Sequence, residues 1–253
     1  DLREYIKLLW DNKGFIIGLF IFAVLVAGLF STFYLTPTYM TEAVLQLSNT
    51  EGLYSNPPTV RQLLKSSDLL KPIMKEYDQD YSEADLRGYI NNNIIVNSIS
   101  DTNILELKVQ NKDPELTFKI TQKMIADFKK SAEKSYNDII SNKKKRIDSL
   151  ENEVNNINKR ISSANNSMDQ IRDNEDIAAA EKSLLINEQI NKLNSLYEQK
   201  NINRQKIQDL EKELLNNHPI EVLNSPYIPE KPIEPNVKLN IAIAGVLALM
   251  LGV

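Results

Sequence analysis

The sequence predicts an α+β membrane protein: two transmembrane helices flank an external α/β base module and a long antiparallel helical hairpin. Three observations support this prediction. An uncharged apolar run lies near the N-terminus, a second apolar run closes the 253-residue chain, and apolar residues repeat as a heptad between them. Each pattern has a physical counterpart: a membrane-spanning helix for the long apolar run and a helix-packing seam for the heptad.

The first apolar run, residues 14–35, carries no charge over about 22 residues, which is enough for a helix to cross a ~30 Å hydrocarbon layer. It is too long for a cleaved signal peptide, and no small-residue cleavage site precedes Thr36. The preceding segment, 1–13, places Leu2, Ile6 and Leu9 on one helical face. It is either a short interfacial helix or an extension of the transmembrane helix.

The second apolar run, residues 239–253, is too short to span a bilayer, and we expect it to be the outer part of a second transmembrane helix. Basic residues flank the first run on its N-terminal side only, at Arg3, Lys7 and Lys13, and none occurs between Thr36 and Val60. By the positive-inside rule, both termini are cytosolic and residues 36–238 lie outside, in the periplasm or extracellular space.

Residues 36–134 are expected to form the α/β base module close to the membrane. Alternation over 39–48 turns Thr41, Ala43, Leu45 and Leu47 to one face of a strand. Residues 59–77 have helical spacing, with an interruption expected at Pro72.

The second half of this module is predicted to be a helix followed by a β-hairpin. Ser82 begins a pattern close to a capping box for a helix over 82–93. Two β-like runs, 94–100 and 104–110, are joined by turn residues and predict the hairpin.

A long helical region begins at Asp113 and Pro114, which suit the N-cap and first helical position. Its apolar positions follow steps of three and four: Ile147, Leu150, Val154, Ile157, Ile161, Ala164, Met168 and Ile171. A second set has the same period: Ile186, Leu193, Leu196, Ile207, Leu210 and Leu214. These positions suit the seam of a hairpin within one chain, and contact between protomers is the alternative.

One uninterrupted helix would be roughly 150 Å long, whereas the segment that follows it reaches at most about 70 Å when extended. The chain must therefore double back if both apolar runs enter one membrane. The turn lies at 162–167 or 172–176, and the unbroken heptad favours the later place. The result is an antiparallel hairpin over 135–217, about 60–90 Å long.

Residues 218–238 are predicted to return to the base as a strand and then to form a proline-rich strut. Four prolines recur every third residue: Pro226, Pro229, Pro232 and Pro235. This spacing favours polyproline II, and the strut would be about 30 Å long and semi-rigid.

The order of these features resembles the Wzz-type chain-length determinants, the polysaccharide co-polymerases of bacterial inner membranes. The similarity rests on "DLREYIKLLWDNKGFI" before the first span, "YMTEAVLQL" after it, "NKDPEL" at 111–116, the heptad helices and the proline strut. Its most specific part is the strut followed by Gly245 and Gly252 in the second span. Family glycines tend to recur every fourth residue, and Leu249 departs from that pattern.

The resemblance implies a ring-like homo-oligomer that regulates how many repeat units a membrane-embedded polymerase adds to a lipid-linked glycan. Polysaccharide, polymerase and bilayer would then be its partners. Two alternatives are the external part of a bacterial tyrosine autokinase for exopolysaccharide export, and a coiled-coil export adaptor or sensor. The first would carry a phosphate-binding loop after Val253, and the second would show glycine-rich strands beside its hairpin.

Composition supports a role without catalysis, cofactor or metal. His218 is the only histidine, cysteine is absent, and no glycine-rich phosphate loop occurs. The net charge of −4 also argues against a general nucleic-acid-binding protein. We therefore expect no catalytic residue, no cofactor and no metal site.

Overall fold

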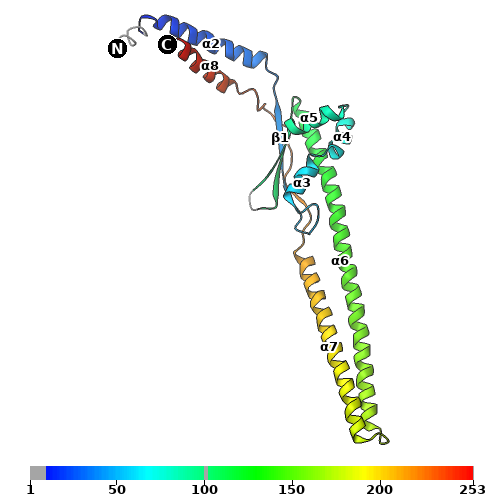
Figure 1. The fold of residues 1–253 in the computed structure, drawn as a ribbon. Coiled ribbons are helices and arrows are strands. Elements are labelled where there is room, and N and C mark those ends of the chain that lie inside the picture. Colours follow the sequence, from blue (N-terminus) through cyan, green and yellow to red (C-terminus); the bar gives the residue numbers. More distant parts are fainter. Residues whose placement is uncertain (1–9, 100–101, 253) are drawn as a thin grey trace. The chain divides into compact units, whose positions relative to one another are not determined.

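The computed structural model describes residues 10–99 and 102–252, which form an α+β fold with a small sheet and long helices (Figure 1). These residues group into two compact units. The first comprises the residues up to Leu47, Leu53–Lys130 and the residues from Ile220 onward, and the second comprises Ser48–Gly52 and Ser131–Pro219. The predicted limits of the functional regions, 36–134 for the base and 135–217 for the hairpin, stay predictions.

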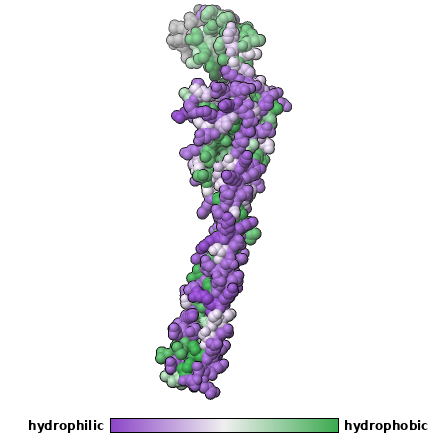
Figure 2. Space-filling view, turned by 90° about the vertical axis from the view of Figure 1, so that its right-hand side faces the viewer, coloured by the Kyte–Doolittle hydropathy of each residue, from purple (hydrophilic) through white to green (hydrophobic). Residues whose placement is uncertain are grey.

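Two apolar helices in the first unit run antiparallel and side by side: α2 (Lys13–Phe33) and α8 (Val237–Gly252) (Figure 1). In the described residues, α2 is the one helix that is long and apolar enough to cross a membrane, and α8 is shorter. Figure 2 shows that much of the visible surface of this helix pair is apolar. The interfacial helix predicted from Leu2, Ile6 and Leu9 lies outside the described residues.

The sheet contains four antiparallel strands in the order β2-β3-β1-β4. Their bounds are β1 Tyr39–Gln46, β2 Ile94–Ser98, β3 Ile104–Asn111 and β4 Glu221–Asn224. The predicted strand face is confirmed, because Thr41, Ala43, Leu45 and Leu47 are fully buried. The predicted β2–β3 hairpin and the strand that returns after residue 218 are also confirmed.

Three short helices contribute further buried apolar residues to this unit: α3 (Pro57–Leu64), α4 (Ser67–Glu76) and α5 (Glu83–Asn93). The interruption predicted at Pro72 is wrong, since Pro72 lies inside α4. The helical region is divided instead at Ser66, whose hydroxyl accepts a hydrogen bond from the Leu69 amide and caps α4. A capping side chain that satisfies a free amide stabilises a helix start there, and α4 tolerates the proline.

The longest helix, α6, runs from Pro114 to Asp173, and α7 runs from Ala179 to Asn216. Asp113 Oδ1 accepts hydrogen bonds from the amides of Glu115 and Leu116, as expected for an N-cap followed by proline. The chain turns between Asp173 and Ala179, so the later of the two predicted turn regions is correct. The antiparallel α6–α7 hairpin forms most of the second unit (Figure 1).

Candidate functional site: the apolar helix pair, its connecting segment and the hairpin seam

Glycines permit the close approach of α2 and α8. A Cβ atom on Gly245 would lie 2.7 Å from Cε2 of Phe20, and one on Gly252 would lie 3.3 Å from the side chain of Ile16. On α2, a Cβ on Gly28 would lie 3.4 Å from Cδ1 of Ile241. Small residues allow helices to pack through van der Waals contact where no hydrophobic driving force exists between them. The structure therefore gives Gly245 and Gly252 a common place in one helix–helix contact.

The departure at Leu249 has a geometric explanation. Leu249 is 44% exposed and lies off the contacting face, whereas Ala248 is buried. The contact follows Gly245, Ala248 and Gly252, which are spaced by three and four residues on one helical face. A leucine at 249 is therefore compatible with close packing along α8.

A polar contact joins the same two helices. The side-chain amide of Asn240 donates a 2.8 Å hydrogen bond to the hydroxyl of Ser31, which is fully buried. In an apolar surrounding, such a bond satisfies groups that would otherwise be costly to bury. This pair was not predicted from the sequence, although Ser31 stands out as a polar residue within the apolar run.

The proline segment is held against the start of β1. Thr38 exchanges backbone hydrogen bonds with Glu234, and its carbonyl oxygen also accepts a 2.8 Å bond from the amide of Ile233. Further back, the hydroxyl of Thr41 donates to the carbonyl of Tyr227 at 2.9 Å. Both ends of the segment are therefore hydrogen-bonded to residues at the start of β1, the strand that follows α2.

The predicted semi-rigid strut stays a prediction, and the structure adds bends that the proline spacing did not indicate. The backbone bends at Glu230–Lys231 and at Ile233, because its end is hydrogen-bonded to Thr38. Pro229 is buried, Pro226 and Pro235 are half-buried, and Pro232 is exposed. The Glu234–Pro235 peptide bond is cis. The prolines thus lie in a bent, packed connection, and any role of theirs in coupling stays a prediction.

The second apolar helix begins two residues before the predicted Leu239. The side chain of Asn236 accepts a hydrogen bond from the Leu239 amide at 3.1 Å, and its backbone carbonyl accepts one from the Asn240 amide. An asparagine cap directly after the last proline therefore fixes where α8 starts.

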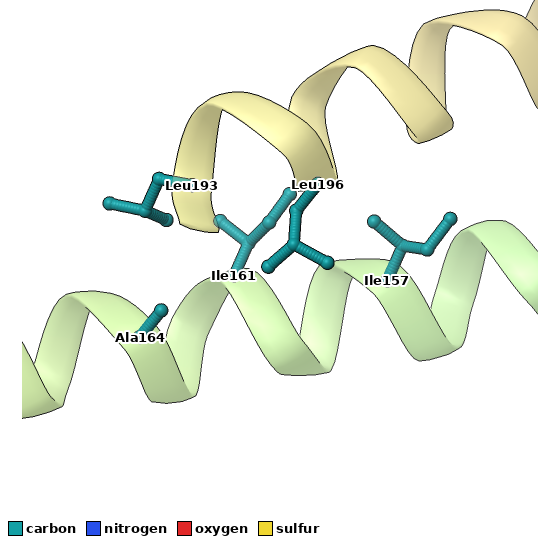
Figure 3. Packing of buried hydrophobic residues seen from close by; sticks show 5 residues of the cluster. All are labelled: Ile157, Ile161, Ala164, Leu193 and Leu196. Carbon is teal, nitrogen blue, oxygen red and sulfur yellow. The ribbon is translucent and has the colours of Figure 1, made fainter. Parts of the chain in front are cut away.

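In the second unit, the hairpin seam contains five buried residues shown in Figure 3: Ile157, Ile161, Ala164, Leu193 and Leu196. Met168 packs against this cluster. Ile147, Leu150 and Val154 continue the buried row along α6, whereas Ile171 is only half-buried. The heptad residues therefore face α7 within the same chain, and their functional importance stays a prediction.

Beyond this cluster, polar contacts cross between the two helices. Asn203 on α7 donates a 3.0 Å hydrogen bond to Glu153, and Lys143 forms a 2.7 Å ion pair with Glu213. An open cavity of about 510 Å³ also lies between the helices and is lined by residues such as Val154 and Ile207. Away from the tight cluster, the seam is thus partly polar and solvated.

A second polar arrangement fixes the end of α7. The side chain of Asn49 donates to the carbonyl of Asn216 at 2.7 Å and accepts from the amide of His218 at 2.8 Å. The hydroxyl of Ser48 donates to the backbone carbonyl of His218, and the hydroxyl of Tyr136 donates to the backbone carbonyl of Asn217. His218 therefore contributes mainly backbone groups at a helix terminus, and this network of distant residues could not be found from the local sequence pattern.

The face of the sheet opposite the buried core carries a charged pair. Lys108 Nζ lies 2.8 Å from a carboxylate oxygen of Glu106, and both side chains are about one-quarter exposed. The hydrogen bond from Lys108 lowers the pKa of Glu106, and the same bond raises the pKa of Lys108. Both groups are therefore charged at neutral pH. Within the described residues, no cluster of metal-ligating side chains is found.

The first apolar helix and the strand that follows it lie within a region that matches a known family model. Residues 1–87 match the Wzz family, described as chain length determinant protein. The predicted resemblance to the Wzz family is confirmed. The matched residues include α2, β1, α3 and α4, and thus both residues, Thr38 and Thr41, that hold the proline segment.

Solved structures of a polysaccharide co-polymerase and of WzzB proteins are also similar to this chain, at 16% identity or less. A full-length bacterial polysaccharide co-polymerase is 16% identical, with 100% of this chain and 95% of that chain covered and a TM-score of 0.43. A fragment of WzzB from Salmonella Typhimurium is 10% identical over 78% of this chain and 100% of its own, with a TM-score of 0.36. The wild-type Shigella flexneri O-antigen chain-length regulator WzzBSF is 14% identical over 77% and 99%, with a TM-score of 0.26. A search of curated proteins found no match.

Proposed function

We propose that this protein is a non-enzymatic regulator of polysaccharide chain length that acts beside a membrane-embedded glycan polymerase. The Wzz match over residues 1–87 carries the proposal. The structure adds physical support, because the matched strand β1 is hydrogen-bonded to the segment that leads into α8. A change in the packing of α2 against α8 can therefore alter the base, and a change in the base can alter this packing.

In this proposal the protein is a two-pass protein of the bacterial inner membrane, with α2 and the helix that begins with α8 as its spans. Lys13 begins α2, and no basic residue occurs between Thr36 and Val60. This asymmetry supports cytosolic termini and a periplasmic or extracellular region at 36–238. Leu215→Cys tests it, because the chain has no cysteine and Leu215 is 86% exposed. A membrane-impermeant maleimide should label this variant in intact spheroplasts, and labelling only after lysis would contradict the topology.

The decisive experiment for the function is expression in a host that lacks its own determinant, with the glycan displayed on a gel. We expect the random length distribution of the empty host to become a band of preferred lengths. An unchanged distribution, with the protein present at normal level in the membrane, would overturn the proposal.

We further propose that the protein works as a closed homo-oligomer, as the Wzz resemblance implies. Mass measurement on protein extracted into nanodiscs should then give one assembly of several copies. A monodisperse monomer at micromolar concentration would contradict this part of the proposal and leave the length assay to decide the rest.

A further inference from the structure

A polar cavity of about 340 Å³ lies in the first unit, where β1 begins and β3 ends. Its volume falls at the lower end of the ~300–1,000 Å³ range of small-molecule sites. Six of its lining residues come from the loop before α5, from α5 itself and from the end of β3: Gln79, Tyr81, Tyr89, Asn93, Asn111 and Lys112. Thr38 completes the lining.

Two tyrosine rings form an aromatic wall of this cavity. The rings of Tyr81 and Tyr89 lie 5.7 Å apart between centroids and are tilted by 34°. Tyr89 is only 9% exposed, and its hydroxyl donates to the carbonyl of Gln110 and accepts from the side-chain amide of Asn111. Burial raises the pKa of Tyr89 to about 12, so this hydroxyl remains protonated at neutral pH. The fold therefore fixes the Tyr89 half of this wall, and the Tyr81 ring packs against it.

The two asparagines are held in place by bonds that use their donors. Asn93 donates to the carbonyl of Tyr89 at 3.1 Å, and Asn111 donates to the hydroxyl of Tyr89 at 3.2 Å. The bond of Asn93 leaves its side-chain carbonyl oxygen as an acceptor in the lining of the cavity. Lys112 adds a flexible cation to these fixed groups. The cavity therefore offers hydrogen-bond donors, acceptors and one positive charge.

We propose that this cavity binds one saccharide unit of a glycan, with an acidic substituent of the sugar directed to Lys112. Aromatic rings suit the apolar C–H face of a sugar, while amide and hydroxyl groups suit its hydroxyls, and a few fixed polar groups of this kind set orientation in small-molecule sites. No carboxylate is found among the described residues that line the cavity, so the Lys112 ammonium gives this lining a formal charge of one positive unit. The assignment rests on the proposed function, since a length regulator must lie close to the growing glycan.

The place of the cavity in the chain fits a glycan held by a lipid carrier. Thr38 follows the last residue of α2, Phe33, by five residues, which span at most about 18 Å even when extended. A sugar bound beside Thr38 is thus within a few sugar lengths of the membrane surface in the proposed topology. The local sequence pattern gives no hint of this site, because its lining comes from three separate segments, at 38, 79–93 and 111–112, which converge only in the fold.

The test is a titration of the full chain in nanodiscs, followed by saturation-transfer NMR, with hexagalacturonate as the acidic probe and maltohexaose as the neutral one. We expect hexagalacturonate to bind, and Tyr81→Ala to raise its Kd at least tenfold. Gln79→Glu keeps the side-chain size but adds a negative charge, and Lys112→Gln removes the cation. Each should raise the Kd for the acidic probe about three- to tenfold, with little effect on the neutral probe.

Tyr197→Ala is the matched control, because Tyr197 is 46% exposed on α7 and belongs to the other unit. It should leave the Kd unchanged. Absence of saturation transfer to both probes, or equal binding by the parent and Tyr81→Ala, would overturn the site. Binding of maltohexaose alone would overturn the assignment of Lys112 to an acidic group.

The glycan gel separates failure of this site from failure of the proposed function. If the parent protein sets a preferred length and Tyr81→Ala sets the same one, the site is wrong and the regulatory function stands. If the parent leaves the glycan distribution random, the proposed function fails whatever the NMR titration shows.

Discussion

Replacing Gly245 by leucine should separate α2 from α8, because the glycine occupies the tightest point of their contact. The Cβ atom alone would lie 2.7 Å from Cε2 of Phe20, closer than carbon atoms pack. In Gly245→Ala, the Phe20 ring can turn aside, and the better helix propensity of alanine offsets part of the cost. In Gly245→Leu, three further carbons must enter the same space, so the helices themselves must move.

Overpacking of this kind costs typically about 1–3 kcal/mol, and we place Gly245→Leu in the upper half of that range because Gly245 is buried between two helices. A cost of about 2–3 kcal/mol lowers the pairing equilibrium roughly 30- to 140-fold. Gly245→Ala should cost less than about 1 kcal/mol, since its clash meets the movable end of one side chain.

Disulfide trapping measures the pairing directly. The chain has no cysteine, and the side chains of Ser31 and Asn240 are within hydrogen-bond distance, so Ser31→Cys with Asn240→Cys gives a reporter pair. Mild oxidation in nanodiscs should close this disulfide rapidly in the parent background. With Gly245→Leu added, the rate of closure should fall by at least an order of magnitude.

Val246→Leu is the matched control, because Val246 neighbours Gly245 but is 58% exposed. It should leave the rate of disulfide closure unchanged. If Gly245→Leu closes the disulfide as fast as the parent, then the glycine does not limit the approach of the helices, and our account of the α2–α8 contact is wrong.

Three further predictions concern the hairpin and the proline segment. Ile157→Asp buries a charge, so it should destabilise the hairpin by about 3 kcal/mol or more, whereas Leu215→Asp at an 86% exposed position should not. Faster hydrogen exchange of the α7 amides in Ile157→Asp, but not in Leu215→Asp, checks this prediction. Asn49→Ala removes both hydrogen bonds of the Asn49 side chain at the end of α7, so the free energy of opening at the His218 amide should fall by about 1–2 kcal/mol. Unchanged protection of this amide from hydrogen exchange would contradict the prediction. Pro232→Gly adds flexibility at an exposed position, and a broader glycan length distribution at normal protein level is expected; a parental distribution would show that stiffness there is irrelevant.

Much of the fold follows from local patterns because the responsible forces act locally. Alternation placed Thr41 and Leu45 on the buried face of β1, since successive side chains of a strand point to opposite faces. Asp113 was predicted as an N-cap because its carboxylate can reach the free amides of the first turn, and it does so. The turn after Asp173 followed from the end of the heptad and from the reach of the chain.

The errors arise where tertiary contacts or a better cap outweigh a local preference. Proline at 72 predicted a helix break, but the hydroxyl of Ser66 provides a better boundary six residues earlier. The proline spacing predicted a semi-rigid strut but not its bends, which accompany the hydrogen bonds of Ile233 and Glu234 to Thr38. Neither contact leaves a periodic signal in the sequence, because each joins a residue to one specific partner.

Thr38 is the residue on which the proposed function depends most closely. Its backbone binds the segment that leads into α8, its position follows the end of α2, and it lines the cavity that we assign to a sugar. A sugar bound there contacts the residue that joins both apolar helices to β1. We therefore propose that ligand occupancy is linked to the arrangement of the α2–α8 pair through Thr38. By reciprocity, a change in helix packing then alters the affinity for the glycan if the glycan favours one packing arrangement.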